Sequence, residues 1–123
     1  MGFTISNIGN GAINNSVSTF NNEPRSKVNT EIDCNEFNEL YISSIKVNMM
    51  DNTSGVYSKL IGIKENGDEV ILHNGIQKYE EIYDITDYVK VKFESIAGMS
   101  GLNNIDFGNF NNFIPFMEFR LRR

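Results

Sequence analysis

The sequence is poor in the residues that hold small secreted domains and metal centres together. Cysteine occurs once, as Cys34, histidine occurs once, as His73, and tryptophan is absent. A single cysteine excludes an internal disulfide, and no Cys/His spacing typical of zinc ligands exists. We interpret Cys34 as a buried thiol, and His73 as a solvated residue in a turn with Asn74-Gly75.

Catalytic motifs are also missing. Nucleophilic catalysis needs a nucleophile, a base and an orienting group within reach, and with one histidine no such set can be identified. No Gly-x-x-x-x-Gly-Lys phosphate loop is present. We therefore expect a protein that is not an enzyme and has no cofactor. Calcium is the one metal to consider, because Asp51 opens an oxygen-rich loop over residues 51–55, but it supplies only one carboxylate.

Long apolar runs and an excess of positive charge are absent as well. No stretch approaches the ~18 apolar residues needed to cross a bilayer, and the first residues lack the features of a signal peptide. The formal net charge is −5, whereas a binder of the phosphate backbone needs clustered Lys and Arg. The basic cluster Arg120, Arg122 and Arg123 is confined to the last predicted strand. We expect neither a nucleic acid nor a membrane as partner.

Short segments of alternating polarity make up most of the chain. Strands are predicted over residues 27–34, 40–49, 88–96 and 116–122, a hairpin of two strands over 57–72, and a short strand over 79–84. Asn66-Gly67 predicts a hairpin with a two-residue type I′ turn. Short strands at regular spacing without a helical period predict an all-β antiparallel sandwich. Its predicted core contains Ile45, Val47, Val89, Val91, Phe93, Phe119 and Leu121.

Residues 1–25 differ in texture from the rest and are predicted to form an extended N-terminal arm, ahead of a sandwich domain over residues 26–123. Asn and Gly recur there and favour turns, yet the apolar residues between them are too many for a solvated linker. Two alternatives stay open: the arm packs on its own domain, or it docks on a neighbouring subunit. The candidate subunit contacts are Phe3, Ile5, Ile8 and Ile13.

A second Asn- and Gly-rich segment spans residues 97–115. Loops longer than ~12–15 residues are uncommon and tend to be functional. One alternative is a loop whose phenylalanines close the open end of the core, and the other is an aromatic recognition surface. The candidate recognition residues are Phe107, Phe110, Asn109, Asn111 and Asn112.

From residue 41 onward the order of features resembles a galactose-binding-like jelly roll of the discoidin type. The segments that carry the resemblance are Ile42-Ser-Ser-Ile45-Lys-Val47, the Asn66-Gly67 hairpin, residues 87–93 and residues 117–121. The bridging disulfide common in secreted discoidin domains is absent here. The resemblance implies a jelly roll that binds glycans or other surfaces through loops at one end, although a shared fold does not by itself transfer function.

Two functions of different class follow. The first is a structural or assembly subunit of a larger particle, similar to accessory proteins of phage virions, tails or baseplates. Its partners would be other protein subunits, and it would be made in the cytoplasm without a signal peptide for a virion or other extracellular particle. The second is a carbohydrate-binding module that recognises a cell-surface glycan. Phe107, Phe110 and Tyr88 would supply rings, and Asn109, Asn111 and Asn112 would supply amides.

Overall fold

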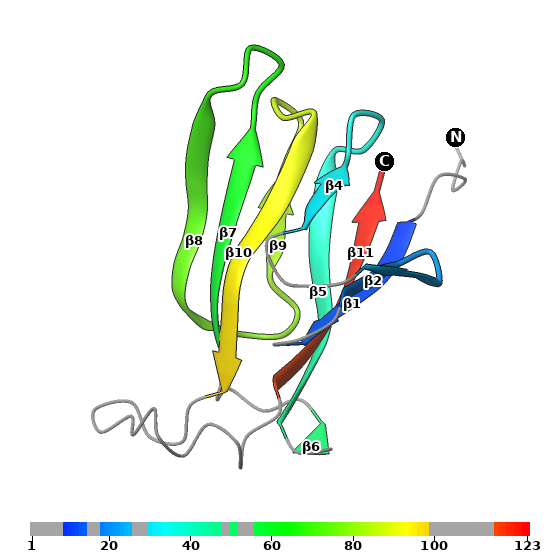
Figure 1. The fold of residues 1–123 in the computed structure, drawn as a ribbon, viewed down its shortest axis with the longest axis vertical. Helices are drawn as coiled ribbons and strands as arrows, with labels where there is room; N and C mark the ends of the chain where they lie inside the picture. The colour runs from blue at the N-terminus through cyan, green and yellow to red at the C-terminus, as the bar shows by residue number, and fades with distance from the viewer. Residues whose placement is uncertain (1–8, 15–17, 26–29, 48–49, 52–55, 99–114) are drawn as a thin grey trace.

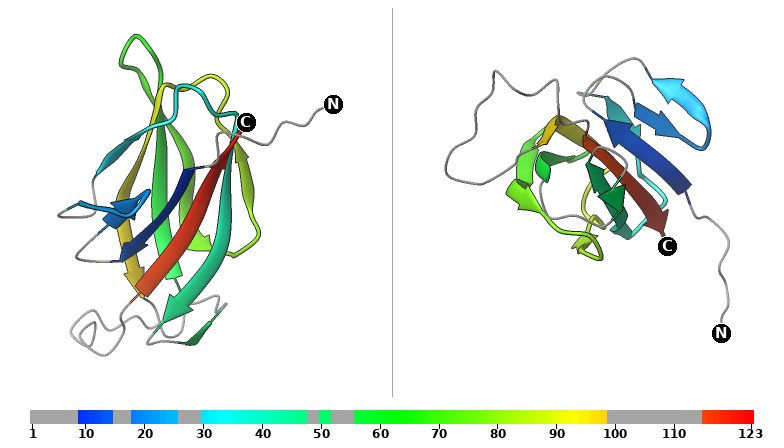
Figure 2. Two further views of the ribbon diagram at one scale, coloured as in Figure 1. Left: turned by 90° about the vertical axis from the view of Figure 1, so that its right-hand side faces the viewer. Right: turned by 90° about the horizontal axis from the view of Figure 1, so that it is seen from below.

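The computed structural model describes residues 9–14, 18–25, 30–47, 50–51, 56–98 and 115–123, and these residues form strands and turns without a helix. The strands are β1 (Gly9–Asn14), β2 (Ser18–Phe20), β3 (Glu23–Arg25), β4 (Glu31–Asp33), β5 (Glu39–Val47), β6 (Met50–Asp51), β7 (Val56–Ile63), β8 (Glu69–Gln77), β9 (Ile82–Asp84), β10 (Lys90–Gly98) and β11 (Pro115–Arg122). They pack as two antiparallel sheets face to face, so the predicted all-β sandwich is confirmed (Figures 1 and 2).

The two sheets differ in the number and order of their strands. The first sheet runs β3-β2-β1-β11-β5, with the short strands β6 and β9 both pairing with β5, and the second sheet runs β4-β10-β7-β8. Without β2, β3 and β6, the other strands counted in chain order follow the sequence 1-8-3-6 in one sheet and 2-7-4-5 in the other. The order of these eight strands is similar to that of a double-sheet jelly roll.

The core lies between the sheets and contains most of the predicted residues. Ile45, Val91, Phe93, Phe119 and Leu121 are at most 1% exposed. The ring of Phe119 lies 5.7 Å from that of Phe93 on the opposite sheet, which ties the two layers together at their centre. The other predicted members differ: Val89 precedes β10 and is only half-buried, and the side chain of Val47 lies outside the described residues.

Three β-bulges change the alternation of β5, β8 and β10, and those in β5 and β10 keep apolar side chains on the core face. The register of β5 against β11 skips Ser43, that of β10 against β7 skips Glu94, and that of β8 against β7 skips Leu72. One extra residue reverses the alternation of a strand. Both Ile42 and Ile45 are therefore fully buried although they are three residues apart.

The N-terminal segment is part of the sandwich from residue 9 onward, which corrects the boundary predicted at residue 25. β1 pairs with β11 along its whole length, and Ile13 is 2% exposed in the core. Asn21 and Asn22 both have positive φ, 53° and 67°, between β2 and β3. A two-residue connection with this geometry is a type I′ hairpin turn. These two asparagines therefore form the turn between two strands, and the Asn-rich composition of this segment is compatible with β-structure.

Two predicted turns also differ from the structure. The hairpin around Asn66-Gly67 is confirmed, but its loop is longer: Gly67 N donates to Lys64 O at 2.8 Å, and Gly67 has positive φ whereas Asn66 does not. The turn predicted at His73-Asn74-Gly75 is wrong, because these residues lie within β8 and pair with β7. The ladder with β7 overrides the local preference of Asn and Gly for turns.

Side-chain hydrogen bonds lie at the two edges of the sandwich, one beside β2 and β4 and the other beside β8 and β9. On one side Ser18 Oγ on β2 donates to Thr30 Oγ1 at 3.3 Å, ahead of β4. On the other, Ser58 Oγ donates to Gln77 Oε1 at 2.8 Å, and Gln77 Nε2 donates to Tyr83 Oη at 2.9 Å. Ser58 and Gln77 are fully buried, and their mutual hydrogen bond offsets the cost of removing these polar groups from water. The second network joins β7 and β8 to β9 of the opposite sheet.

We expect Phe93→Ala to lower the free energy of unfolding by about 3–5 kcal/mol, because it removes a buried ring and leaves a cavity between the sheets. Urea denaturation followed by circular dichroism measures the change. Ile82→Ala is the matched control, since Ile82 is 54% exposed. Equal losses of stability in the two variants would contradict the position of Phe93 at the centre of the core.

Candidate interaction surface

Most of the recognition residues predicted from the sequence lie outside the described part of the chain. This applies to Phe3, Ile5 and Ile8 among the subunit contacts, and to Phe107, Phe110, Asn109, Asn111 and Asn112 in the long loop. Ile13 is described, but it packs in the core of its own sandwich, so it offers no surface to a neighbour in this conformation. Asp51 lies in β6, and its side chain is not among those described.

Cys34 and His73, the single cysteine and the single histidine of the chain, are both held in packed surroundings. Cys34 is fully buried, as predicted, and burial together with the charge of Asp33 raises its pKa to about 11. A thiol with this pKa is a poor nucleophile at neutral pH. His73 is half-buried in β8, its ring meets that of Tyr83 edge-on at 5.9 Å, and its Nε2 lies 3.1 Å from Ile76 O. These contacts correct its prediction as a solvated turn residue.

The described ranges contain neither a metal-binding cluster nor a membrane-spanning helix. No group of three or more His, Cys, Asp or Glu side chains is placed there to hold a metal ion. The described residues also include no helix that is long and apolar enough to span a bilayer.

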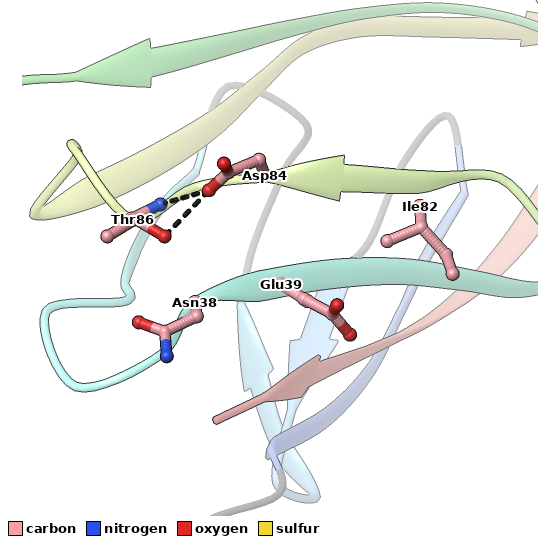
Figure 3. A pocket seen from close by; sticks show the side chains of 5 residues that line it. All are labelled: Asn38, Glu39, Ile82, Asp84 and Thr86. Atoms are coloured by element: carbon pink, nitrogen blue, oxygen red, sulfur yellow. Dashed lines mark hydrogen bonds between the residues drawn. The ribbon is translucent and has the colours of Figure 1, made fainter.

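A polar hollow of about 310 Å³ lies where β9 meets the start of β5 (Figure 3). Asn38, Glu39, Ile82, Asp84 and Thr86 line it. Glu39 and Asp84 stand directly opposite each other on the two strands, an arrangement in which like charges repel. The cation that offsets this repulsion is Arg122 of β11, whose Nη2 lies 3.3 Å from Glu39 Oε1.

The chemistry of this hollow is that of hydrogen bonding. Thr86 donates to Asp84 Oδ1 from its hydroxyl at 2.7 Å and from its backbone N–H at 2.9 Å. These two bonds lower the pKa of Asp84 below its usual value. The carboxylate is therefore ionised at neutral pH and is unsuited to act as a general acid. With Asn38 and Glu39 it presents acceptors and an amide to a polar ligand.

The outer face of the second sheet is covered by ion pairs. Lys59 Nζ lies 2.6 Å from Glu94 Oε1, Lys92 Nζ lies 3.4 Å from Glu69 Oε2, and Lys90 Nζ lies 3.4 Å from Glu31 Oε1. The hydrogen bond between Lys59 and Glu94 raises the pKa of Lys59 and lowers that of Glu94.

These pairs also explain why two isoleucines on this face are buried. Ile61 and Ile63 point away from the core, yet they are 3% and 8% exposed. Lys92 and Lys90 stand opposite them on β10, and the aliphatic stems of lysines can cover apolar neighbours. Exposed ion pairs contribute little stability individually. The face is therefore polar around Ile61 and Ile63, whereas Ile71, which stands opposite Ile61 on β8, is exposed on the same face.

Large apolar side chains are exposed at β8 and β9. Ile71 on β8 is 56% exposed, Ile82 on β9 is 54% exposed, and Tyr79 in the connection between them is 39% exposed. β8 and β9 lie on the side of the sandwich away from β1, β2 and β3 (Figure 1). The sequence did not reveal the full length of β8, because residues 73–75 have the composition of a turn.

β8 is also the least protected strand at the end of a sheet. β4, β6 and β9 have two or three residues each, both ends of β4 are exposed acids, and β3 contains Pro24, which has no N–H to offer. β8 has nine residues, contains neither proline nor lysine, and carries one charged side chain, Glu69. No described strand pairs with its outer side, so its backbone groups form a template for a further strand.

Comparison of the chain with protein-family models, with curated proteins and with solved structures finds no match in any of the three.

Removing the hydroxyl of Thr86 tests the geometry of the polar hollow. We expect Thr86→Val to raise the pKa of Asp84 toward 3.8, its ordinary value, because the side-chain hydrogen bond is the largest cause of the shift. A lowered carboxyl pKa contributes stability above the ordinary pKa that is lost as pH falls. Carboxyl carbon NMR titration measures the pKa, and Thr86→Ser, which keeps the hydroxyl, is the control. An unchanged pKa in Thr86→Val would contradict the contact.

Proposed function

We propose that this chain is a non-enzymatic assembly subunit of a larger particle. The observation that carries the proposal is the nine-residue strand β8, whose outer side has no partner among the described strands and on which Ile71 is exposed. Long strand edges promote unwanted pairing, and monomeric proteins protect them with charges, proline, short length or β-bulges. β8 has a bulge at Leu72, but residues 73–77 after it form a regular edge without a charged residue or proline. The other strands at the sheet ends have such protection, so the exposure of β8 is best explained by a partner that covers it.

The assignment to a particular family and particle rests on the order of the strands and on the sequence pattern. The jelly-roll order supports a galactose-binding-like domain of the discoidin type, and small subunits of phage virions, tails and baseplates are our proposed class. Jelly rolls serve both as viral capsid domains and as lectin domains, so this part of the proposal rests on an analogy of fold. We place the chain in a virion or another extracellular particle, with other protein subunits as its partners.

Glycan binding is the second candidate function, and the polar hollow between β5 and β9 favours it. A volume of about 310 Å³ is at the lower limit for small-ligand sites. Asn38, Asp84 and Thr86 offer an amide, a carboxylate and a hydroxyl beside the exposed side chain of Ile82 (Figure 3). These are groups that bind sugar hydroxyls, and Ile82 offers an apolar surface to the face of a sugar ring.

Light scattering coupled to size-exclusion chromatography tests the assembly function directly. We expect the purified chain at micromolar concentration to have a mass that is a multiple of 14.0 kDa, because the β8 edge is covered in the assembled state. A mass of 14.0 kDa that does not change with concentration would contradict assembly of this chain with itself.

A glycan array tests the second function. We expect any glycan that binds through the hollow to lose at least about tenfold in affinity when Asn38→Ala and Asp84→Asn are combined, a loss of about 1.4 kcal/mol. Asn66→Ala, on the hairpin loop between β7 and β8, is the control that leaves the hollow intact. A blank array with the unmodified chain would contradict glycan binding, and so would a signal that both variants retain equally.

A further inference from the structure

Three Asn-Gly dipeptides occur in the chain, and the fold places them in different environments. They are Asn10-Gly11, Asn66-Gly67 and Asn74-Gly75. An asparagine that precedes glycine is open to an intramolecular reaction, because a residue without a Cβ leaves its backbone nitrogen accessible to the neighbouring side chain. All three lie in the described part of the chain, so their surroundings decide which of them can react.

The reaction at an Asn-Gly dipeptide is deamidation through a cyclic imide, and water is its only co-reactant. The backbone nitrogen of the glycine attacks Cγ of the asparagine, so that an N–Cγ bond forms and the Cγ–Nδ2 bond breaks. Ammonia leaves with the proton of the backbone nitrogen. Water then opens the imide at either of its carbonyls. One product is aspartate, and the other is isoaspartate, in which the main chain runs through the side-chain carboxyl.

Strand pairing protects two of the three dipeptides. Closure of the imide requires rotation about the Cα–C bond of the asparagine, because an extended backbone keeps the next nitrogen away from Cγ. Asn10-Gly11 lies in β1 between β2 and β11, where the glycine pairs with Phe20 on one side and Phe119 on the other. Asn74-Gly75 pairs with β7, and Tyr57 donates a hydrogen bond to Oδ1 of the asparagine. Both are held extended while these ladders stay intact.

Asn66-Gly67 lies instead at the exposed tip of the hairpin between β7 and β8 (Figure 1). The reacting nitrogen, Gly67 N, donates to Lys64 O at 2.8 Å, and opening a single contact at an exposed hairpin tip costs little free energy. The side chain is already turned toward the backbone, because Asn66 Oδ1 accepts from Asp68 N at 2.9 Å. An N–H in this position stabilises the negative charge that develops on Oδ1 during the attack.

We propose that Asn66 is a site of spontaneous deamidation in the folded chain, independent of both proposed functions. Either product replaces a neutral amide by a carboxylate at the hairpin tip. The hydrogen bond of 3.2 Å from Asn66 Nδ2 to Asp68 Oδ2 is then lost. The new charge stands beside that of Asp68, in a hollow that Glu65 and Asp87 line together with Lys64. The tip of the hairpin therefore becomes more acidic as the protein ages.

Peptide mapping by mass spectrometry tests the proposal on the full folded chain, incubated at slightly alkaline pH. We expect the peptide that contains Asn66 to gain the mass difference between an amide and a carboxyl group. Its rate should exceed the rates at Asn10 and Asn74 at least about tenfold, which corresponds to about 1.4 kcal/mol in activation free energy. An isoaspartyl methyltransferase with labelled S-adenosylmethionine is the probe for the isoaspartate product, and it should label the same peptide.

Two controls separate the effect of the fold from that of the dipeptide. In concentrated urea the three dipeptides should react at similar rates, because the protection of Asn10 and Asn74 comes from their ladders. Asn66→Gln should abolish labelling by the methyltransferase, since the longer side chain would have to close a larger ring. An Asn66 that stays intact in the folded chain would overturn the proposal, whatever its rate in urea. Equal rates at all three dipeptides of the folded chain would overturn it too.

Discussion

An unpaired strand edge is the constraint on which the rest of this structure depends. Each residue of a strand carries one backbone donor and one acceptor, and those without a partner strand must be hydrated, capped or paired. The sandwich satisfies this demand internally for much of its length, since β11, β7 and most of β5 lie between two neighbours, while β10 has β4 beside it at residues 90–92. It ends its sheets in short, acidic or proline-containing strands, except at β8. The function that we propose follows from that exception.

Packing within the single chain accounts for many of the described glycines and apolar side chains. Phe119 packs flat against Phe20 at 6.1 Å because Gly11 leaves room for its ring, and each of β5, β8 and β10 carries one bulge. Ion pairs cover the outer face of the second sheet. Among the glycines with described surroundings, Gly9, Gly11 and Gly62 leave room for aromatic rings and Gly67 has positive φ, whereas Gly75 has neither reason among the described residues. Together with the exposed side chain of Ile71, it marks β8 as a candidate for contact with another molecule.

The sequence predicted the fold better than the interaction surface. Alternation in β10 and β11 identified Phe93 and Phe119 as core residues, because a half-buried strand requires period two. The bulge at Ser43 could not be predicted with this rule, since it reverses the phase within one strand. Asn74-Gly75 has the composition of a turn, and only the long-range ladder with β7 makes it a strand. For this reason the β8 edge could not be identified from the sequence. The recognition residues that the sequence favoured, in the loop over residues 97–115, lie outside the described part of the chain.

Amide hydrogen exchange as a function of protein concentration tests the central claim most directly, because it reports on the β8 backbone itself. If β8 is covered in the assembled state, the outward-facing amides within residues 73–77 exchange more slowly as the concentration rises, while those of β4, another strand at a sheet end, keep the same rate. Exchange in β8 that is fast and independent of concentration would contradict the account.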